Sequence, residues 1–349
     1  MESYTKDDTI FVQIASYRDP ELQWTLKDLF EKAKRPENIF VGICHQYDMK
    51  GDEDKHLFEI PFSHPEQLRI DEVDYREAKG LFFARSKTQQ LYKNEKWTAQ
   101  FDSHMRFYKN WDEIAILQLK KLIKQGYKYP LITSYPPGYN PETNEIEDNN
   151  TSLMTVKIFD KNTGIIRMTN CNYNCFEYFT NTAFISGNNF VTLAEQILKV
   201  PYDKYMYFTD EANISVRSWT NGFDFFHLEN NYVAHLWNTE KLKNTKANRR
   251  VISDDNKTGY HNNSKSNARE RALFNMQKSN DPEVLENIKE YGLGNKRTLR
   301  DYERFSGVDF RRKTTREHTK QGIFEDWNEV SKINDIKNIF NSIRYKYAK

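Results

Sequence analysis

Apolar and polar segments alternate along the first fifty residues. The nearly continuous apolar run TIFVQIA ends at the polar turn SYRDP, and the residues that follow place Leu22, Leu26 and Leu29 at helical spacing. The run NIFVGICHQ then has apolar residues on both faces, which is typical of a central parallel strand. The pattern predicts a β-α-β start in which Asp19 caps the helix and Pro20 takes the first helical position.

The alternation resumes after an acidic and irregular stretch at residues 51–75. We expect a helix, a strand, a helix and a strand, in the order REAKGLFFARSKTQQLY, KWTAQFDSH, residues 111–125 and YPLITSY. This order predicts a doubly wound α/β fold with a mostly parallel sheet, in which ligands bind at the carboxyl ends of the strands. Ser16, Tyr17, Arg18, Asp102 and His104 all lie at such ends.

The pattern after residue 150 is mixed rather than parallel. It predicts two strands joined by a turn, a short strand, a helix, and a strand that leads into a helix, in the order LMTVKIFDKNTGIIRMTN, AFISG, residues 189–199 and residues 205–222. Residues 238–267 are rich in Asn, Lys and Ser and predict a mobile loop, and the remainder is mainly helical in pattern. We therefore expect a catalytic domain over residues 1–237, a flexible loop over 238–270 and a helical C-terminal region over 271–349 packed on the catalytic domain.

Composition and charge narrow the class of protein. The 349 residues contain 52 basic and 50 acidic side chains, and a net charge of +2 argues against a dedicated nucleic-acid binder. The amino terminus lacks the pattern of a signal peptide, and no apolar run approaches membrane-spanning length. The three cysteines are too few and too scattered for a disulfide framework, so we expect a cytoplasmic protein without a transmembrane segment.

The stretch FDSHMRF carries the clearest candidate chemistry. Asp102 and His104 alternate at the end of a predicted strand, and both side chains can reach one divalent ion if the chain turns directly after the strand. A carboxylate and an imidazole with open coordination positions suit manganese or a similar ion. Because Asp-x-His also occurs by chance, the spacing alone leaves a purely structural role open.

Several segments together resemble one family of enzymes. They are IFVQIASYRDPEL, GLFFAR, FDSHMRFYKNWD, FTDEANISVRSWTNGFDFF and NYVAHLW, and YGLGNKRTLRDYERFSGVDF continues the likeness. Read together they resemble the GlcNAc-transferase family that includes the cytoplasmic polypeptide hydroxyproline α-N-acetylglucosaminyltransferase and, more distantly, the mucin-type polypeptide GalNAc-transferases. The resemblance implies a GT-A fold for the catalytic domain, a UDP-sugar donor, a divalent cation such as Mn²⁺ held by a DXD-like motif, and retention of anomeric configuration.

The resemblance also implies roles for individual residues. Asp102, His104 and His235 match the metal ligands, and the donor-binding positions are Ala15, Ser16, Tyr17, Arg18, Arg85, Asp102 and Ser103. On the residues alone, His235 could instead be a half-buried strand histidine, Arg85 a solvated helix arginine, and Arg18 a partner of Asp19 or of a neighbouring helix. Cys44, His45 and Gln46 could line a uridine pocket or pack in a loop.

An acidic pair marks the candidate catalytic position. Asp210 and Glu211 stand where the family carries Gly-Glu-Glu or Gly-Gly-Glu, so Glu211 is the better match and Asp210 is a departure that leaves the donor preference open. Such a carboxylate could bind the donor sugar or orient the acceptor. An acidic helix amino terminus favoured by the helix dipole would explain Asp210 equally well.

The expected function is transfer of a sugar from a UDP-sugar to a hydroxyl group of a protein or glycan acceptor. The expected sugar is GlcNAc. The loop, with Lys265, Arg269 and Arg271 near its end, would close over the donor. A metal-dependent phosphodiesterase or nucleotidyltransferase is an alternative, although such enzymes usually cluster more carboxylates for two ions. An RNA-binding protein that uses RTLRDYERF and FRRKTTREHTK is a further alternative, which the near-zero net charge disfavours, so we expect no nucleic-acid partner.

Overall fold

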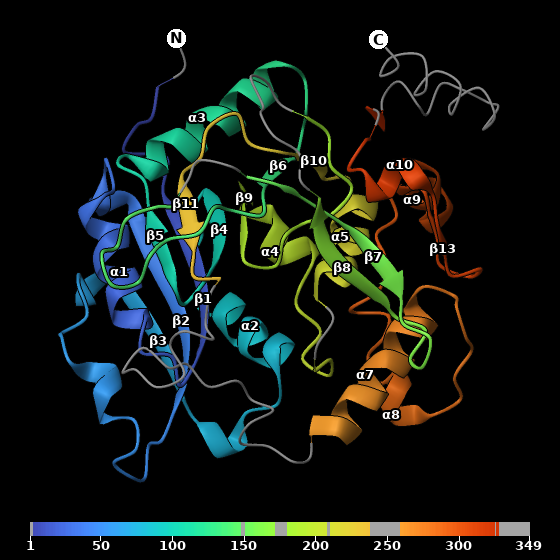
Figure 1. The fold of residues 1–349 in the computed structure, drawn as a ribbon, viewed down its shortest axis with the longest axis horizontal. Helices are drawn as coiled ribbons and strands as arrows, with labels where there is room; N and C mark the ends of the chain where they lie inside the picture. The colour runs from blue at the N-terminus through green and yellow to red at the C-terminus, as the bar shows by residue number, and fades with distance from the viewer. Residues whose placement is uncertain are drawn as a thin grey trace.

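A twisted seven-stranded sheet forms the centre of the protein (Figure 1). The computed structural model describes residues 3–147, 151–171, 180–207, 210–237, 259–324 and 326–327. In sheet order the strands are β10 (Asp224–Phe226), β6 (Pro130–Thr133), β9 (Asn189–Leu193), β4 (Trp97–Asp102), β1 (Ile10–Tyr17), β2 (Ile39–Tyr47) and β3 (Leu68–Asp74). β9 runs antiparallel to its neighbours β4 and β6, and the other pairings are parallel. The predicted mixed α/β fold with a mostly parallel sheet is confirmed.

Helices cover both faces of this sheet. On one face α1 (Leu22–Glu31) and α3 (Trp111–Lys124) bury Leu26, Leu29 and Leu119 against β1, β2 and β4. On the other face α2 (Leu81–Gln90) contributes Phe82 to a second core, which also contains residues of α5 (Asp210–Thr220). The short helix α4 (Glu195–Lys199) follows β9 directly. Burial on both faces explains why β1 and β2 read as largely apolar runs.

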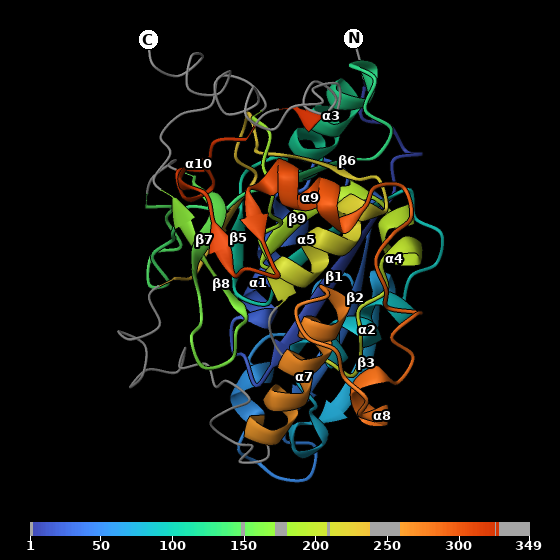
Figure 2. The same cartoon turned by 90° about the vertical axis from the view of Figure 1, so that its right-hand side faces the viewer.

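Small ladders and a helical region surround this framework. β5 (Met105–Phe107) pairs with β11 (Val233–His235), and β7 (Leu153–Phe159) pairs with β8 (Ile166–Cys171), both antiparallel. The C-terminal part contains α7 (Gly259–Leu273), α8 (Pro282–Leu285), α9 (Leu299–Ser306), β12 (Val308–Asp309), β13 (Thr314–Thr315) and α10 (Glu317–Lys320). Figure 2 shows α9 over α5, and Phe305 of α9 stacks on Trp219 of α5 with ring centroids 5.4 Å apart.

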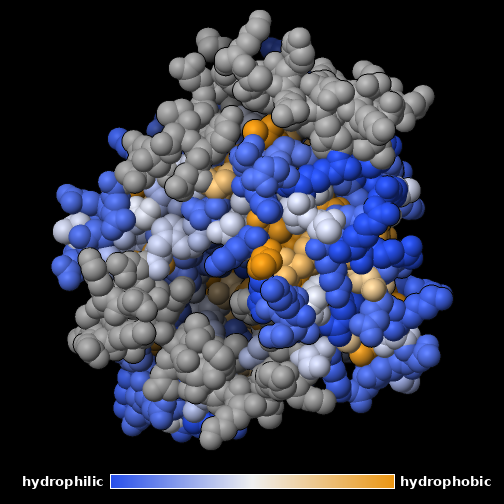
Figure 3. Space-filling model, turned by 45° about the vertical axis from the view of Figure 1, so that its right-hand side comes forward, coloured by the Kyte–Doolittle hydropathy of each residue, from blue (hydrophilic) through white to orange (hydrophobic). Residues whose placement is uncertain are grey.

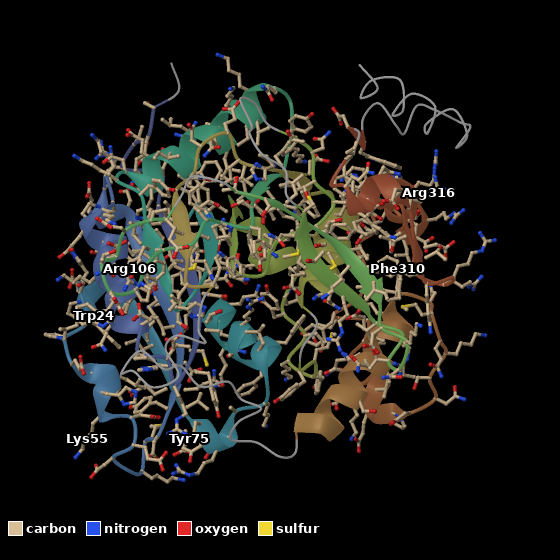
Figure 4. The ribbon with its side chains drawn as sticks, viewed as in Figure 1. Trp24, Lys55, Tyr75, Arg106, Phe310 and Arg316 are labelled. Carbon is tan, nitrogen blue, oxygen red and sulfur yellow. The ribbon has the colours of Figure 1, made fainter. Side chains whose placement is uncertain are left out.

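The C-terminal part shares a hydrophobic core with the rest of the chain. Phe274, Tyr302 and Phe310 belong to the same buried cluster as Phe82 and Phe184. Figure 4 labels Phe310 and Arg316 in this region, on the side of the molecule away from α1. The described C-terminal residues therefore pack against the rest of the chain. Among the described residues, no helix is long and apolar enough to cross a membrane.

The structure corrects several sequence predictions. Residues 189–199 form β9 and α4 rather than one helix, because an apolar run buried on both faces gives no periodicity that distinguishes a strand from a buried helix. The stretch read as irregular contains the edge strand β3, whose charged residues suit a sheet edge. The segment AFISG forms no strand and contributes an isolated bridge at Ser186. Within the expected loop, residues 238–258 lie outside the described residues, whereas the chain from Gly259 onward is helical in α7.

Candidate active site

A cavity of about 500 Å³ opens at the carboxyl ends of β1, β2 and β4. In the space-filling view the middle of the molecule is hollowed, and apolar atoms are exposed there among hydrophilic neighbours (Figure 3). The cavity is lined by Ala15, Tyr17, Asp19, Gln46, Gly80, Leu81, Ala84, Arg85, Asp102, Ser103, His104, Tyr135, Met154, Ser186, Gly187, Asn188, Glu211, His235 and Trp237. Its position agrees with the ligand-binding edge expected of a doubly wound sheet.

The register of two ladders brings Asp102, His104 and His235 together. Asp102 ends β4 opposite Ala15 of β1, and the chain turns at Ser103 and His104 before it enters β5. In the β5–β11 ladder His235 lies opposite Met105, so it is placed beside the residue that precedes Met105. The backbone N–H of Leu236 also donates to the carbonyl of His104 over 3.2 Å. The turn that the sequence required after Asp102 is therefore present.

The three side chains offer a set of ligand atoms suited to one cation. One ligand atom from each side chain lies within 4.8 Å of the others. The Nε2 atoms of His104 and His235 are 3.1 Å apart, and His235 Nε2 is 3.3 Å from Asp102 Oδ2. Two imidazoles and one carboxylate whose donor atoms converge on one point fit a divalent transition-metal ion with open positions for other ligands. This is the donor set that the family resemblance implied.

Nearby positive charge keeps the Asp102 carboxyl ionised. Burial alone would raise the pKa of Asp102, but the hydrogen bond from His235 and the electrostatic effects of the neighbouring His104, His235 and Arg85 side chains outweigh burial and hold that pKa well below its usual range. An ionised carboxylate is the form that binds a cation.

Arg85 is a buried part of the site rather than a solvated helix residue. Its Nη2 donates to the carbonyl of Gly187 over 2.6 Å and lies 3.5 Å from Asp102 Oδ1. Gln100 Nε2 donates to the same carbonyl over 2.7 Å, and the Tyr202 hydroxyl donates to Gln100 Oε1 over 2.7 Å. This network holds the turn at residues 186–188 against the Asp102 side of the cavity.

The predicted nucleotide-binding turn is divided between two sides of β1. Ala15 and Tyr17 line the cavity, and so does Gln46 at the end of β2. Ser16 is fully buried and does not line it. Arg18 is directed away from the cavity, where its Nε donates to Asp54 over 2.9 Å and its Nη2 donates to Glu53 over 2.6 Å. Asp54 is the N-cap residue of the neighbouring 3-10 helix Lys55–Phe58, so these bonds pair Arg18 with the start of a helix.

Of the acidic pair and the basic residues near the expected loop, only Glu211 is found in the lining of the cavity among the side chains that the structure describes. Glu211 lines the cavity, and its charge, after burial, contributes to raising the pKa of Tyr135 to about 12. Asp210 begins α5, and its side chain lies outside the described part of the chain. Arg269 bonds to Asp203, and Arg271 Nη1 donates to the carbonyl of Thr163 over 2.6 Å, so neither guanidinium lines the cavity.

The sequence did not identify three other parts of this site. The Tyr135 and Trp237 rings are stacked with centroids 3.9 Å apart, and the Trp237 ring also contacts His235. Asp19, read as a helix cap, lines the cavity and bonds to His104. The third is the turn at residues 186–188. A Gly-Asn pair after an apolar segment was the available signal for that turn.

Comparison with known proteins connects this arrangement to a family. A family model described as Glycosyltransferase (GlcNAc) matches residues 9–60 and 53–312. No curated protein matches the chain closely enough to count as a relative. Among solved structures, the crystal structure of GalNAc-T7 with UDP, GalNAc and Mn²⁺ is similar, with a TM-score of 0.51 and 14% identity over 82% of this chain and 55% of that chain. The present chain therefore spans about half the length of GalNAc-T7. Because the family model covers most of the chain, the protein belongs to the Glycosyltransferase (GlcNAc) family.

Proposed function

We propose that the protein is a divalent-metal-dependent, retaining glycosyltransferase that transfers GlcNAc from UDP-GlcNAc to a hydroxyl group of a protein or glycan. The observation that carries this proposal is the convergence of Asp102, His104 and His235 on one point at the edge of the cavity. The presence of UDP, GalNAc and Mn²⁺ in the similar GalNAc-T7 structure supports a UDP-sugar and a divalent ion as its ligands.

The nucleotide would bind at the end of the cavity formed by β1 and β2. Gln46 lines this end, and its Nε2 donates to the carbonyl of Ser16 over 3.2 Å, which fixes the orientation of the amide. Its Oε1 has no hydrogen-bond partner among the described residues. An amide oxygen held in this way can accept a hydrogen bond from the imide N–H of uracil, and the ring of Tyr17 provides a surface for the base.

The diphosphate and the sugar would occupy the part of the cavity between Asp102 and Glu211. Mn²⁺ or another divalent ion, bound by Asp102, His104 and His235, supplies positive charge to the departing diphosphate. Arg85 keeps Asp102 and the 186–188 turn in place, and Glu211 can accept hydrogen bonds from sugar hydroxyls. The acceptor hydroxyl would attack the donor-sugar carbon that carries the diphosphate, from the same face that the diphosphate leaves. A diphosphate oxygen would take the proton of that hydroxyl. Covalent catalysis by Glu211 is the less favoured variant.

We also propose a cytoplasmic location for the enzyme. The support is compositional: three cysteines in 349 residues do not suit a disulfide-stapled secreted protein, and Cys44 and Cys171 are free. The acceptor would present a hydroxyl group of serine, threonine, hydroxyproline or a sugar.

Ligand-induced stabilisation tests the donor and the metal together. UDP-GlcNAc with Mn²⁺ should raise the Tm because a ligand that binds only the native state stabilises it by mass action, and EDTA should abolish the shift. Donor hydrolysis without acceptor, measured in parallel, should require the metal. Asp102→Ala and His235→Ala should each lose most of both responses, by on the order of tenfold or more in turnover. Stabilisation by GDP-sugars or CMP-sugars in place of UDP-sugars would contradict the proposal.

A further inference from the structure

We propose that Asp19 is a positioning residue that fixes the tautomer and the direction of His104, so that His104 Nε2 is available to the metal. This role rests on the metal site of the proposed function. Asp19 follows β1 in the chain and lies 85 residues from His104, yet its Oδ2 is 2.8 Å from His104 Nδ1. Both side chains are buried, with 4% and 7% of their surface exposed.

The hydrogen bonds of Asp19 determine which nitrogen of His104 carries the proton. Asp19 Oδ2 also accepts a bond from the Ser103 hydroxyl over 2.7 Å, and Asp19 Oδ1 accepts one from the backbone N–H of Glu21 over 3.0 Å. In its usual ionised form the Asp19 carboxylate has no hydrogen to donate, so the hydrogen between it and His104 would reside on Nδ1. A neutral imidazole protonated at Nδ1 presents a lone pair at Nε2, and that atom faces His235 and Asp102.

Other contacts from the same region hold the backbone of the metal-binding turn but do not touch its ligand atoms. Thr25 Oγ1 donates to the carbonyl of Ser103 over 2.8 Å and accepts from the N–H of Met105 over 2.9 Å. Asp28 Oδ2 accepts from the N–H of Phe107 over 2.6 Å. Arg106, labelled in Figure 4, bonds to Glu21 over 2.7 Å. Thr25 and Asp28 of α1 therefore fix the backbone of the turn and of β5, whereas Asp19 acts on the ligand side chain itself.

A change of Asp19 to asparagine separates these two functions. If the oxygen of the new amide keeps the bond from the Glu21 N–H, the NH₂ group of that amide faces Nδ1 of His104 and the Ser103 hydroxyl. An NH₂ group cannot accept the Nδ1 hydrogen, so the imidazole would move its proton to Nε2 and lose its lone pair toward the metal. If the amide turns over, it loses the backbone bond of Glu21 instead. Carboxylates that orient a ligating histidine typically contribute about 10- to 100-fold to metal affinity.

The test uses Asp19→Asn, with Asp28→Asn as a matched control on α1. Mn²⁺ binding, followed by the electron paramagnetic resonance of free Mn²⁺, should weaken by about 10- to 100-fold in Asp19→Asn and by less than about twofold in Asp28→Asn. The Tm of each variant in EDTA measures structural damage separately. In the unchanged, metal-free protein, ¹⁵N NMR of the histidine rings should find the His104 proton on Nδ1, a result that does not depend on any variant folding.

Each outcome has one interpretation. Equal Mn²⁺ affinity in Asp19→Asn and the parent protein, equal losses in both variants, or a His104 proton on Nε2, would overturn the positioning role and leave Asp19 as a helix-end residue. If the parent protein binds no Mn²⁺, that result contradicts the metal site and the proposed function instead. Weaker binding confined to Asp19→Asn, with the proton on Nδ1, would support the role.

Discussion

At the scale of single residues, the geometry of Arg85 explains why this position needs a guanidinium group. Its Nη2 contacts both the carbonyl of Gly187 at 2.6 Å and Asp102 Oδ1 at 3.5 Å, and its Nη1 is 3.5 Å from the Tyr202 hydroxyl. A planar fork with several fixed donors can reach three partners from one side chain, whereas an ammonium is a compact charge on a flexible stem.

We therefore expect Arg85→Lys to lower kcat by about tenfold or more, equivalent to about 1.4 kcal/mol of transition-state stabilisation. The rate of UDP-sugar turnover at saturating Mn²⁺ measures the effect. Arg76→Lys is the control, because Arg76 is 45% exposed in its ion pairs with Asp48 and Asp74 and does not line the cavity. Parental kcat in Arg85→Lys would refute the requirement for a fork.

The sequence predicts a site residue well when its contacting residue is close in the chain, and poorly when that residue is far away. Asp102 and His104 could be assigned because they are neighbours in a motif, and Glu211 was identified by the family resemblance. The role of Asp19 could not be predicted, because its local context is that of a helix start and its partner lies 85 residues away. Arg18 follows the same rule, since its partner Asp54 is 36 residues away in an irregular segment.

At the scale of elements, α7 is joined to the cavity wall by a chain of polar contacts. Arg269 of α7 bonds to Asp203, and the Ser266 hydroxyl of the same helix accepts from the N–H of Tyr207. The carbonyl of Tyr207 in turn accepts from the N–H of Leu81 over 3.0 Å, at the start of α2. Gly80, which precedes α2, has φ +107°, and a Cβ there would lie 2.5 Å from the Tyr207 carbonyl oxygen. α7 therefore supports the wall formed by Gly80 and Leu81.

Breaking the Arg269–Asp203 pair should destabilise the protein strongly. Both side chains are almost fully buried, at 2% and 3% exposure, and Arg269→Met would leave the Asp203 carboxylate without the guanidinium that bonds to it directly. We expect a loss of about 3–5 kcal/mol in the free energy of unfolding, measured by urea denaturation near neutral pH. Lys265→Met on the same helix breaks the exposed pair with Glu283 and should cost less than about 1 kcal/mol. Similar losses in both variants would contradict a special role for the buried pair.

The length and the hydrophobic pattern of an element decide whether the sequence can predict it. β1 and β2 are predictable because burial on both faces produces long, largely apolar runs. β5 and β11 have three residues each, too few for any periodic signal, and their pairing depends on tertiary structure. β9 was read as a helix because the run NFVTLAEQILK contains no turn residue between the strand and α4.

At the scale of the whole molecule, buried histidines make stability depend on pH. Burial lowers the pKa of His45 and of His227 from 6.5 to about 4, and burial with the charge of Arg316 does the same for His318. The unfolded chain therefore binds more protons than the folded one between pH 6.5 and about 4. The stability that these groups contribute is present above pH 6.5 and is lost as the pH falls through this window.

We expect the Tm to fall as the pH is lowered from 6.5 to about 4, and His45→Leu to reduce that fall. His45 is 1% exposed among the rings of Tyr47, Phe58 and Phe62, and neither of its ring nitrogens has a hydrogen-bond partner among the described residues. Leucine removes the titrating group without breaking a hydrogen bond. Each unit of pKa difference corresponds to about 1.4 kcal/mol, so scanning calorimetry at several pH values can resolve the change. Parallel Tm curves for the two proteins would show that His45 does not contribute.

The β5–β11 ladder also bears on the order in which the protein assembles the proposed metal site. His104 and His235 are 131 residues apart, and they meet through a ladder of three residue pairs. Contacts between such distant segments form only after a loss of chain entropy, so we expect the site to be completed late on the folding pathway. An ion that binds a feature absent from the transition state slows unfolding and leaves the folding rate almost unchanged. In the cell, a bound ion would therefore extend the lifetime of molecules that have already folded, without helping the nascent chain to reach that state.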